Sequence, residues 1–164
     1  MSQTTRNLQG PNSLLVNPVP SQIRSRIMAS VKGRHTLPEL RVRRILHALG
    51  FRFRLHRKGL PGSPDIVLRK YKIAIFVHGC FWHRHEACRY ATIPRTNRQY
   101  WLAKFSKNTF RDQVALEMTH KAGWRTLIVW ECALKGAFDS EGLRRSLFES
   151  IKNAEQHTEI PLQL

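Results

Sequence analysis

The chain has 164 residues, which is enough for one domain with a real hydrophobic core and too few for two. Hydrophobic residues make up 41% and charged residues 24%, so the composition is that of a globular protein and excludes a disordered one. Its 28 Lys and Arg outnumber its 11 Asp and Glu, which gives a formal net charge of +17. Few enzymes that act on small neutral metabolites carry such a charge, and its concentration in residues 24–64 indicates a polyanionic partner such as nucleic acid.

The sequence shows neither an apolar run long enough for a membrane span nor a secretory signal, so we expect a cytoplasmic protein. Three cysteines are an odd number for a disulfide framework. In the cytoplasm they are expected to be free thiols or metal ligands.

The first predicted elements follow from turn residues and helix signals. Residues 1–22 are rich in Gly, Pro, Asn and Ser without a sustained period, which predicts a flexible tail. Thr36 and Glu39 fit a capping box at the start of a helix over 36–49. Residues 51–55 alternate apolar and basic side chains, which is typical of a half-exposed strand.

The remaining elements are predicted from apolar runs and from the turns between them. They are a hairpin of strands 66–68 and 73–77, an irregular insert 79–96, a helix 98–122, a strand 124–131 and a last helix that begins near Ser140. This order predicts an α/β fold in which helices flank a central mixed sheet. The domain is expected to cover residues 23–156, with residues 157–164 as a C-terminal tail.

Asp65 follows a Gly- and Pro-rich loop and opens a buried strand. An aspartate there can simply begin a strand after a turn. A carboxylate fixed at a rigid strand end is also the hard oxygen ligand that Mg²⁺ prefers, as a nuclease requires. The nearby insert supports the second interpretation, because His78, His83 and His85 crowd within it and a histidine can take a proton from water near neutral pH.

The thiols of Cys80, Cys88 and Cys132, together with His85, form a candidate ligand set. Three cysteines and one histidine make a closed tetrahedral zinc site, which would pin the irregular insert to the core and be structural. The alternative is three unrelated buried thiols, since free cysteine often packs as a small hydrophobic residue.

The order of elements, with Pro-Asp on the second strand, resembles the restriction-endonuclease-like core. The acid and lysine usual on the next strand of that fold are missing, because this strand reads Ile-Phe-Val-His at 75–78. The segments LPGSPDIVL, IFVHGCFWHRHEAC and GWRTLIVWECAL resemble the very short patch repair endonucleases, and the resemblance runs from about Arg24 to Leu134.

That resemblance implies a catalytic Mg²⁺ held by Asp65 and by the backbone carbonyl of Val77. His83 is implied as the base or water-positioning group and His78 as a neighbour of the scissile phosphate, and either histidine could be the main base. Glu39 is implied to hold His83, although its position in the capping box already gives it a structural role. The family spacing supports the four zinc ligands and leaves a choice between His85 and His83.

A second group of residues is expected to meet DNA. Phe81 and Trp82 lie among cations and can wedge between bases, or they can pack around the metal site. One helix face can contact a groove or simply be solvated, and it consists of Trp101, Lys104, Asn108 and Arg111. The resemblance implies that Phe81, Trp82 and Trp101 intercalate beside a T·G mismatch, with Met28 entering from the other groove.

These observations predict a monomeric, Mg²⁺-dependent endonuclease that nicks duplex DNA 5′ to the thymine of a T·G mismatch. Two alternatives stay open. One is a zinc-stabilised DNA-binding module without catalysis, and the other is a nuclease of the same fold with a different DNA substrate.

Overall fold

The computed structural model describes residues 33–56, 59–135, 140–153 and 155–161. The predicted N-terminal tail and Met28 lie outside these residues. Within them, no helix is both long and apolar enough to cross a bilayer.

A five-stranded mixed sheet forms the centre of the fold, with strands in the order β1-β2-β3-β4-β5. The strands are β1 (Arg54–Leu55), β2 (Ile66–Leu68), β3 (Ile73–His78), β4 (Arg125–Trp130) and β5 (His157–Ile160). The first three strands are antiparallel, with β2 and β3 joined through a 3-10 turn, η1 (Arg69–Tyr71). The last three run parallel, since β3 pairs with β4 and β4 with β5.

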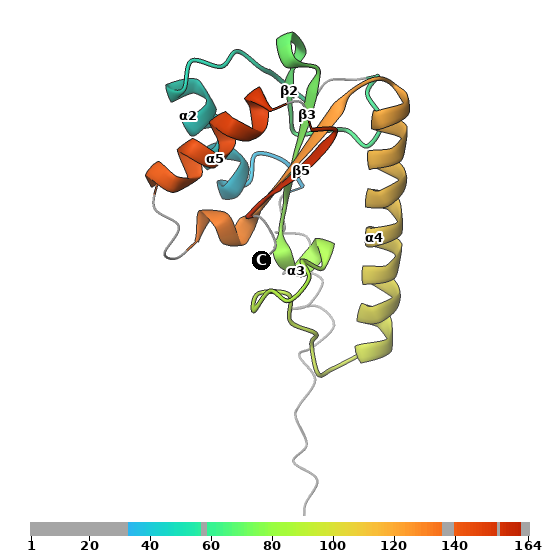
Figure 1. Ribbon diagram of the computed structural model, residues 1–164. Coiled ribbons are helices and arrows are strands. Elements are labelled where there is room, and N and C mark those ends of the chain that lie inside the picture. The colour runs from blue at the N-terminus through green and yellow to red at the C-terminus, as the bar shows by residue number, and fades with distance from the viewer. Residues whose placement is uncertain (1–32, 57–58, 136–139, 154, 162–164) are drawn as a thin grey trace, which may run out of the picture. The chain divides into compact units, whose positions relative to one another are not determined.

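Helices cover both faces of the sheet (Figure 1). Helices α2 (Leu37–Ala48) and α5 (Ser140–Lys152) lie on one face, where Val42, Leu46, Leu147 and Ile151 join the buried core. The long helix α4 (Arg98–Lys121) lies on the other face, over a smaller cluster that includes Phe76 and Ile128. The predicted α/β fold with a mixed sheet flanked by helices is therefore confirmed.

The start of α2 is the predicted capping box. The hydroxyl oxygen of Thr36 accepts the backbone N–H of Glu39 at 3.5 Å, and the carboxylate of Glu39 accepts the backbone N–H of Thr36 at 3.3 Å. These bonds satisfy backbone donors that a helix start otherwise leaves unpaired. Gly50 then ends the helix with a φ of 80°, a conformation that glycine adopts without strain.

Three predicted elements differ from the structure. The strand expected over 51–55 is limited to β1, because Phe51 turns into the core between α2 and α5 and does not join the ladder. The insert expected to be irregular begins with a short helix, α3 (Cys80–His83), which is too short to show a helical period.

The third difference is β5, which forms within the segment expected to be a C-terminal tail. Its first three residues are polar and only Ile160 is buried. The segment therefore lacks the apolar alternation by which a strand is predicted. Its parallel pairing with β4 makes it an edge of the sheet and part of the folded domain.

Candidate active site and metal centre

The candidate site lies where β3 and β4 end. These parallel strands finish in register, with His78 opposite Trp130. Cys80 follows β3 after one residue, and Cys132 follows β4 within η2 (Glu131–Leu134). Because parallel strands present their carboxyl ends at the same edge, both segments leave the sheet side by side.

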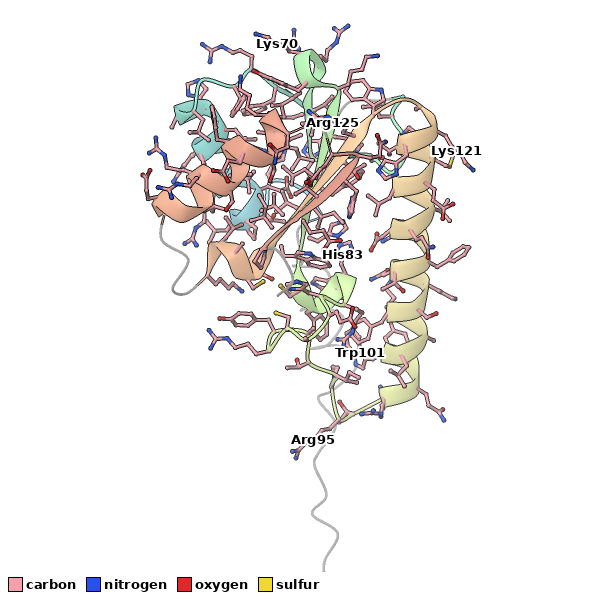
Figure 2. All side chains as sticks on the ribbon, viewed as in Figure 1. Lys70, His83, Arg95, Trp101, Lys121 and Arg125 are labelled. Carbon is pink, nitrogen blue, oxygen red and sulfur yellow. The ribbon has the colours of Figure 1, made fainter. Side chains whose placement is uncertain are left out.

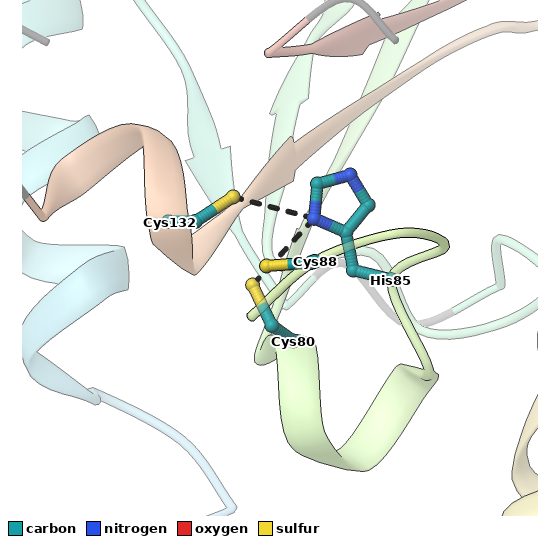
Figure 3. Close-up of side chains that lie close together, drawn as sticks. All are labelled: Cys80, His85, Cys88 and Cys132. Atoms are coloured by element: carbon teal, nitrogen blue, oxygen red, sulfur yellow. Dashed lines mark hydrogen bonds between the residues drawn. The ribbon is translucent and has the colours of Figure 1, made fainter. Parts of the chain in front are cut away.

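The predicted ligand set comes together at this edge (Figure 3). Donor atoms of Cys80, His85, Cys88 and Cys132 all lie within 4.8 Å of one another. Nδ1 of His85 is 3.3 Å from Sγ of Cys132 and 3.8 Å from Sγ of Cys80. Three sulfurs and one imidazole nitrogen fit a metal that prefers soft or borderline ligands in tetrahedral geometry.

Whether the thiols of this cluster carry protons depends on whether such a metal is bound. Burial raises the pKa of Cys80 and of Cys132 above the ordinary thiol value. Both thiols therefore hold their protons at neutral pH when no cation is bound, and binding of a metal must release them.

His78 and His83 form a stacked pair beside this cluster. Their ring centroids are 3.9 Å apart and their planes differ by 8°. His78 is 7% exposed, and burial, reinforced by the neighbouring His83, lowers its pKa well below the ordinary value. His78 is therefore a neutral imidazole at neutral pH, able to donate one hydrogen bond and accept another.

Asp112 holds His83, and the sequence did not single it out for this. Oδ2 of Asp112, on α4, lies 2.5 Å from Nδ1 of His83 (the latter labelled in Figure 2). A carboxylate only accepts, so Nδ1 carries the proton and Nε2 is left as the basic nitrogen. A carboxylate–imidazole pair of this kind can serve as a general base for an attacking water.

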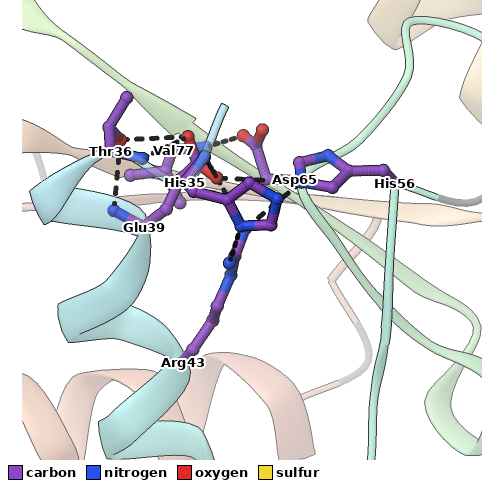
Figure 4. Close-up of polar contacts among 7 residues, drawn as sticks. All are labelled: His35, Thr36, Glu39, Arg43, His56, Asp65 and Val77. Atoms are coloured by element: carbon purple, nitrogen blue, oxygen red, sulfur yellow. Dashed lines mark hydrogen bonds and ion pairs between the residues drawn. The ribbon is translucent and has the colours of Figure 1, made fainter. Parts of the chain in front are cut away.

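The structure gives Glu39 partners other than His83, and its expected role in holding His83 stays a prediction. It is 3% exposed, and its carboxylate accepts the guanidinium of Arg43 at 2.6 Å besides the capping bonds (Figure 4). Arg43 also lies 2.8 Å from Nδ1 of His35 and 3.3 Å from Nε2 of His56. Because a guanidinium can only donate, both ring nitrogens accept.

Asp65 lies next to this network, just before β2 (Figure 4). Its Oδ2 accepts the backbone N–H of Val77 at 2.8 Å. Burial raises the pKa of Asp65 to about 6 even though this hydrogen bond favours the carboxylate. Since β2 and β3 are antiparallel, the start of β2 and the end of β3 meet at one edge, which brings Asp65 to the same end of the sheet as His78.

Aromatic side chains pack between α3 and α4. The ring of Phe81 meets those of Trp82, Trp101 and Phe105 edge to face, with centroids 5.0, 5.4 and 5.1 Å apart. The first three rings are only half-buried, whereas Phe105 is buried. Figure 2 shows Trp101 near the start of α4 and His83 closer to the sheet, both between α4 and α3.

The predicted face of α4 exists, since the helix runs unbroken through Trp101, Lys104, Asn108 and Arg111. Asn108 does not lie on an open surface, however. It is 6% exposed, its Nδ2 donates to the backbone carbonyl of Trp82 at 3.1 Å, and its Oδ1 accepts from Arg111 at 3.4 Å. Asn108 thus ties α3 to α4, and its expected role in reading base edges stays a prediction.

Comparison with known proteins finds several DNA endonucleases similar to this chain. The family described as DNA mismatch endonuclease Vsr matches residues 19–89. The type II nicking enzyme V.XorIIP of Xanthomonas oryzae pv. oryzae is 42% identical over 123 residues, which cover 75% of this chain and 90% of that protein. The DNA mismatch endonuclease Vsr of Escherichia coli (strain K12) is 43% identical over 113 residues, 69% of this chain and 72% of that protein.

Among solved structures, the Homing Endonuclease I-Bth0305I Catalytic Domain aligns with a TM-score of 0.48 and 21% identity over 72% of this chain and 99% of that one. The sequence relatives match over most of their own length and at well above 30% identity. On these matches, the chain belongs to the Vsr family of DNA mismatch endonucleases.

Proposed function

We propose that this mismatch endonuclease binds duplex DNA as a monomer in the cytoplasm and recognises a T·G mismatch, as arises when 5-methylcytosine deaminates. It then nicks the strand 5′ to the mispaired thymine. The observation that carries the proposal is that Asp65, just before β2, and His78, at the end of β3, lie at one end of the sheet, where His83 stacks on His78 and pairs with Asp112. One such site on one small domain breaks one strand.

Asp65 and the carbonyl of Val77 would hold a catalytic Mg²⁺. Within the described residues Oδ2 of Asp65 takes the Val77 N–H, and Oδ1 accepts no hydrogen bond and is free for a cation. The N–H and carbonyl of a strand residue point towards the same neighbouring strand, so the Val77 carbonyl faces the side of Asp65. Two hard oxygens suit Mg²⁺, which when bound offsets the charge of the scissile phosphate and of the leaving oxygen.

His83 acts as the general base in this proposal. Asp112 holds the Nδ1 proton, fixes the ring and stabilises the imidazolium that forms when Nε2 takes a proton from water. His78 stays neutral and stacks on His83, so its ring is fixed and its N–H can donate to a phosphate oxygen.

The four-ligand cluster holds a structural Zn²⁺. A site with Cys80, His85, Cys88 and Cys132 as ligands is closed, which leaves no coordination position for water or substrate. Its contribution is to fix the insert that carries Phe81, Trp82 and His83 to the end of β4.

The aromatic cluster forms the mismatch wedge. Phe81, Trp82 and Trp101 intercalate beside the T·G pair, because a mispaired step is easier to unstack than a matched one. Lys104 and Arg111 on the same helix contact phosphates. Met28 is expected to enter from the other groove. Asn108 fixes the backbone of Trp82 and so sets the direction of the wedge.

A strand-cleavage assay tests the proposal. Labelled duplexes with T·G, A·C or A·T at one position are incubated with Mg²⁺ or without it, using the wild-type protein and Asp65→Ala. We expect one nick in the T·G duplex that needs both Mg²⁺ and Asp65. Equal cleavage of the A·T duplex would point to a nuclease with another substrate, and an undiminished nick from Asp65→Ala would refute the metal assignment.

A further inference from the structure

Trp130 contacts both His78, which belongs to the candidate active site, and His85, which belongs to the candidate metal centre. It is the last residue of β4, 6% exposed, and its indole stacks on the ring of His85 with centroids 4.2 Å apart and planes 11° apart. Its edge-to-face contact with His78 has a centroid distance of 5.3 Å and an angle of 72°. A single indole therefore contacts one ring from each of the two centres.

The indole is itself held from β5. Nε1 of Trp130 donates to Oε2 of Glu159 at 2.7 Å. The other oxygen, Oε1, lies 3.1 Å from Nε2 of His157, whose Nδ1 is 2.7 Å from the hydroxyl of Thr126. The hydrogen bond with His157 is the main reason why the pKa of Glu159 is lowered, so the carboxylate is ionised and accepts at both oxygens at neutral pH.

Ring stacking alone leaves a side chain some freedom to slide and rotate in its plane, whereas a short hydrogen bond to a charged acceptor fixes direction as well as distance. The bond to Glu159 thus fixes the indole, and the indole limits where the rings of His78 and His85 can lie. Outer partners of this kind commonly tune metal and catalytic sites.

We infer that Glu159 is a positioning residue for the nicking reaction, acting through the indole of Trp130 on His78 and His85. This inference rests on the proposed function, because it takes His78 as part of the reacting site and His85 as a metal ligand. It also makes β5 part of the catalytic apparatus, through the hydrogen bond between Glu159 and the indole.

The test compares three variants with the wild-type protein. Glu159→Leu removes the acceptor at similar size, Glu159→Gln keeps an acceptor oxygen, and Trp130→Phe keeps a ring but loses the donor. Ile160→Val is the matched control, because it weakens core packing on the same strand without touching the polar chain. Each protein is assayed for single-turnover nicking of T·G duplex at saturating DNA, for DNA affinity, for bound zinc and for Tm.

We expect Glu159→Leu to lower the single-turnover rate by about 10-fold or more, with little change in DNA affinity. Glu159→Gln should recover most of the rate. In the NMR spectrum, the indole N–H resonance of Trp130 is identified by its loss in Trp130→Phe. Its chemical shift should change in Glu159→Leu. Ile160→Val should lower Tm and leave the rate unchanged at a temperature where it stays folded. A purely structural role of Glu159 would lower Tm without this loss of rate.

Two results would overturn the inference: a wild-type rate from folded Glu159→Leu, or an equal loss of rate from Ile160→Val. If Glu159→Leu does not fold, Glu159→Ala, Trp130→Phe and their double variant decide, because rate losses that simply multiply would show that the two residues act independently. Failure of the proposed function has a different signature, since the wild-type protein itself would then leave the T·G duplex uncut.

Discussion

Nδ1 of His83 and Oδ2 of Asp112 lie 2.5 Å apart, although one residue is at the end of α3 and the other is in the middle of α4. The contact fixes the tautomer of the imidazole and joins α3 to the long helix α4. Asn108, one turn earlier on α4, donates a hydrogen bond to the backbone carbonyl of Trp82, which also lies in α3. Helix α4 thus fixes both His83 and the backbone of Trp82, the residues proposed as base and as part of the wedge.

Asp112→Asn tests the base. The amide can still occupy the space but no longer stabilises an imidazolium, and it can favour the wrong tautomer of His83. We expect the single-turnover nicking rate at saturating DNA to fall by about 10²- to 10⁴-fold, with Tm and DNA affinity close to the wild-type values. A rate within a few-fold of wild type, measured with the same labelled T·G duplex, would remove Asp112 from the mechanism.

Glu39→Gln is expected to act on stability. The amide keeps an acceptor for the cap but leaves the buried guanidinium of Arg43 without its counter-charge, so the free energy of unfolding should fall by about 1–3 kcal/mol. Urea unfolding measures the loss. A second change, Arg43→Met, should recover part of it because the uncompensated charge is gone, and a further loss in the double variant would contradict this account.

The ionisation of Asp65 should make the folded protein less stable as the pH rises, which is the opposite of the usual effect of an aspartate. Burial raises its folded pKa from 3.8 to about 6, so the metal-free folded protein keeps a proton between those values that the unfolded chain has released. This contribution to stability is complete below the unfolded pKa and is lost as the pH rises through the folded pKa.

Asp65→Asn should therefore raise the free energy of unfolding of the Mg²⁺-free protein by about 1–3 kcal/mol at about pH 7.5, with no gain near pH 4. The same variant should not nick. Thermal unfolding at the two pH values, in buffer without Mg²⁺ and without a strong chelator of zinc, measures the difference. An equal shift at both pH values would show that the ionisation of Asp65 is not its cause.

Removal of the proposed structural zinc should unfold the insert. Cys132→Ser and chelated wild-type protein should both lose bound zinc, show a lower Tm and stop nicking, because neutral thiols cannot replace the ligand bonds. Bound zinc is measured by elemental analysis, and stability is measured as Tm. Zn²⁺ should restore the chelated wild-type protein and Mg²⁺ should not. Full activity at zero bound zinc would exclude a structural metal at this cluster.

The aromatic cluster should govern discrimination. Trp101→Ala removes one ring of the wedge, and base–aromatic stacking is worth about 1–3 kcal/mol, so binding to T·G duplex should weaken by about 5- to 150-fold. Binding to A·T duplex, which gains nothing from intercalation, should change little. Phe110→Ala is the matched control on the same helix, because its ring is exposed and lies outside the cluster. Equal losses from both variants would mean that no specific wedge exists.

Local patterns predicted the elements whose signals lie within a few neighbouring residues. The capping box of α2, the hairpin of β2 and β3, and the ends of α4 follow from residues close together in sequence. The gathering of Cys80, His85, Cys88 and Cys132 was also predictable, because the chain has only three cysteines and two of them lie with His85 in one insert.

Long-range contacts were not predictable in the same way. Asp112 looks like any acid on a helix until α4 is placed against α3, and the ion pair of Glu39 with Arg43 could not be told from the capping box alone. Periodicity put Asn108 on the correct face of α4 but could not show that α3 covers it. Strand β5 lacks apolar alternation and exists through its pairing with β4.

The placement of ligands beyond the ends of β3 and β4 has a consequence for folding kinetics. These two strands pair in parallel across the whole of α4, so their ladder forms only after a long chain segment has closed, and such closure is slow. A metal held by Cys80 and Cys132 closes the same loop. Refolding from urea should therefore be faster when zinc is present from the start than when it is added after the chain has collapsed.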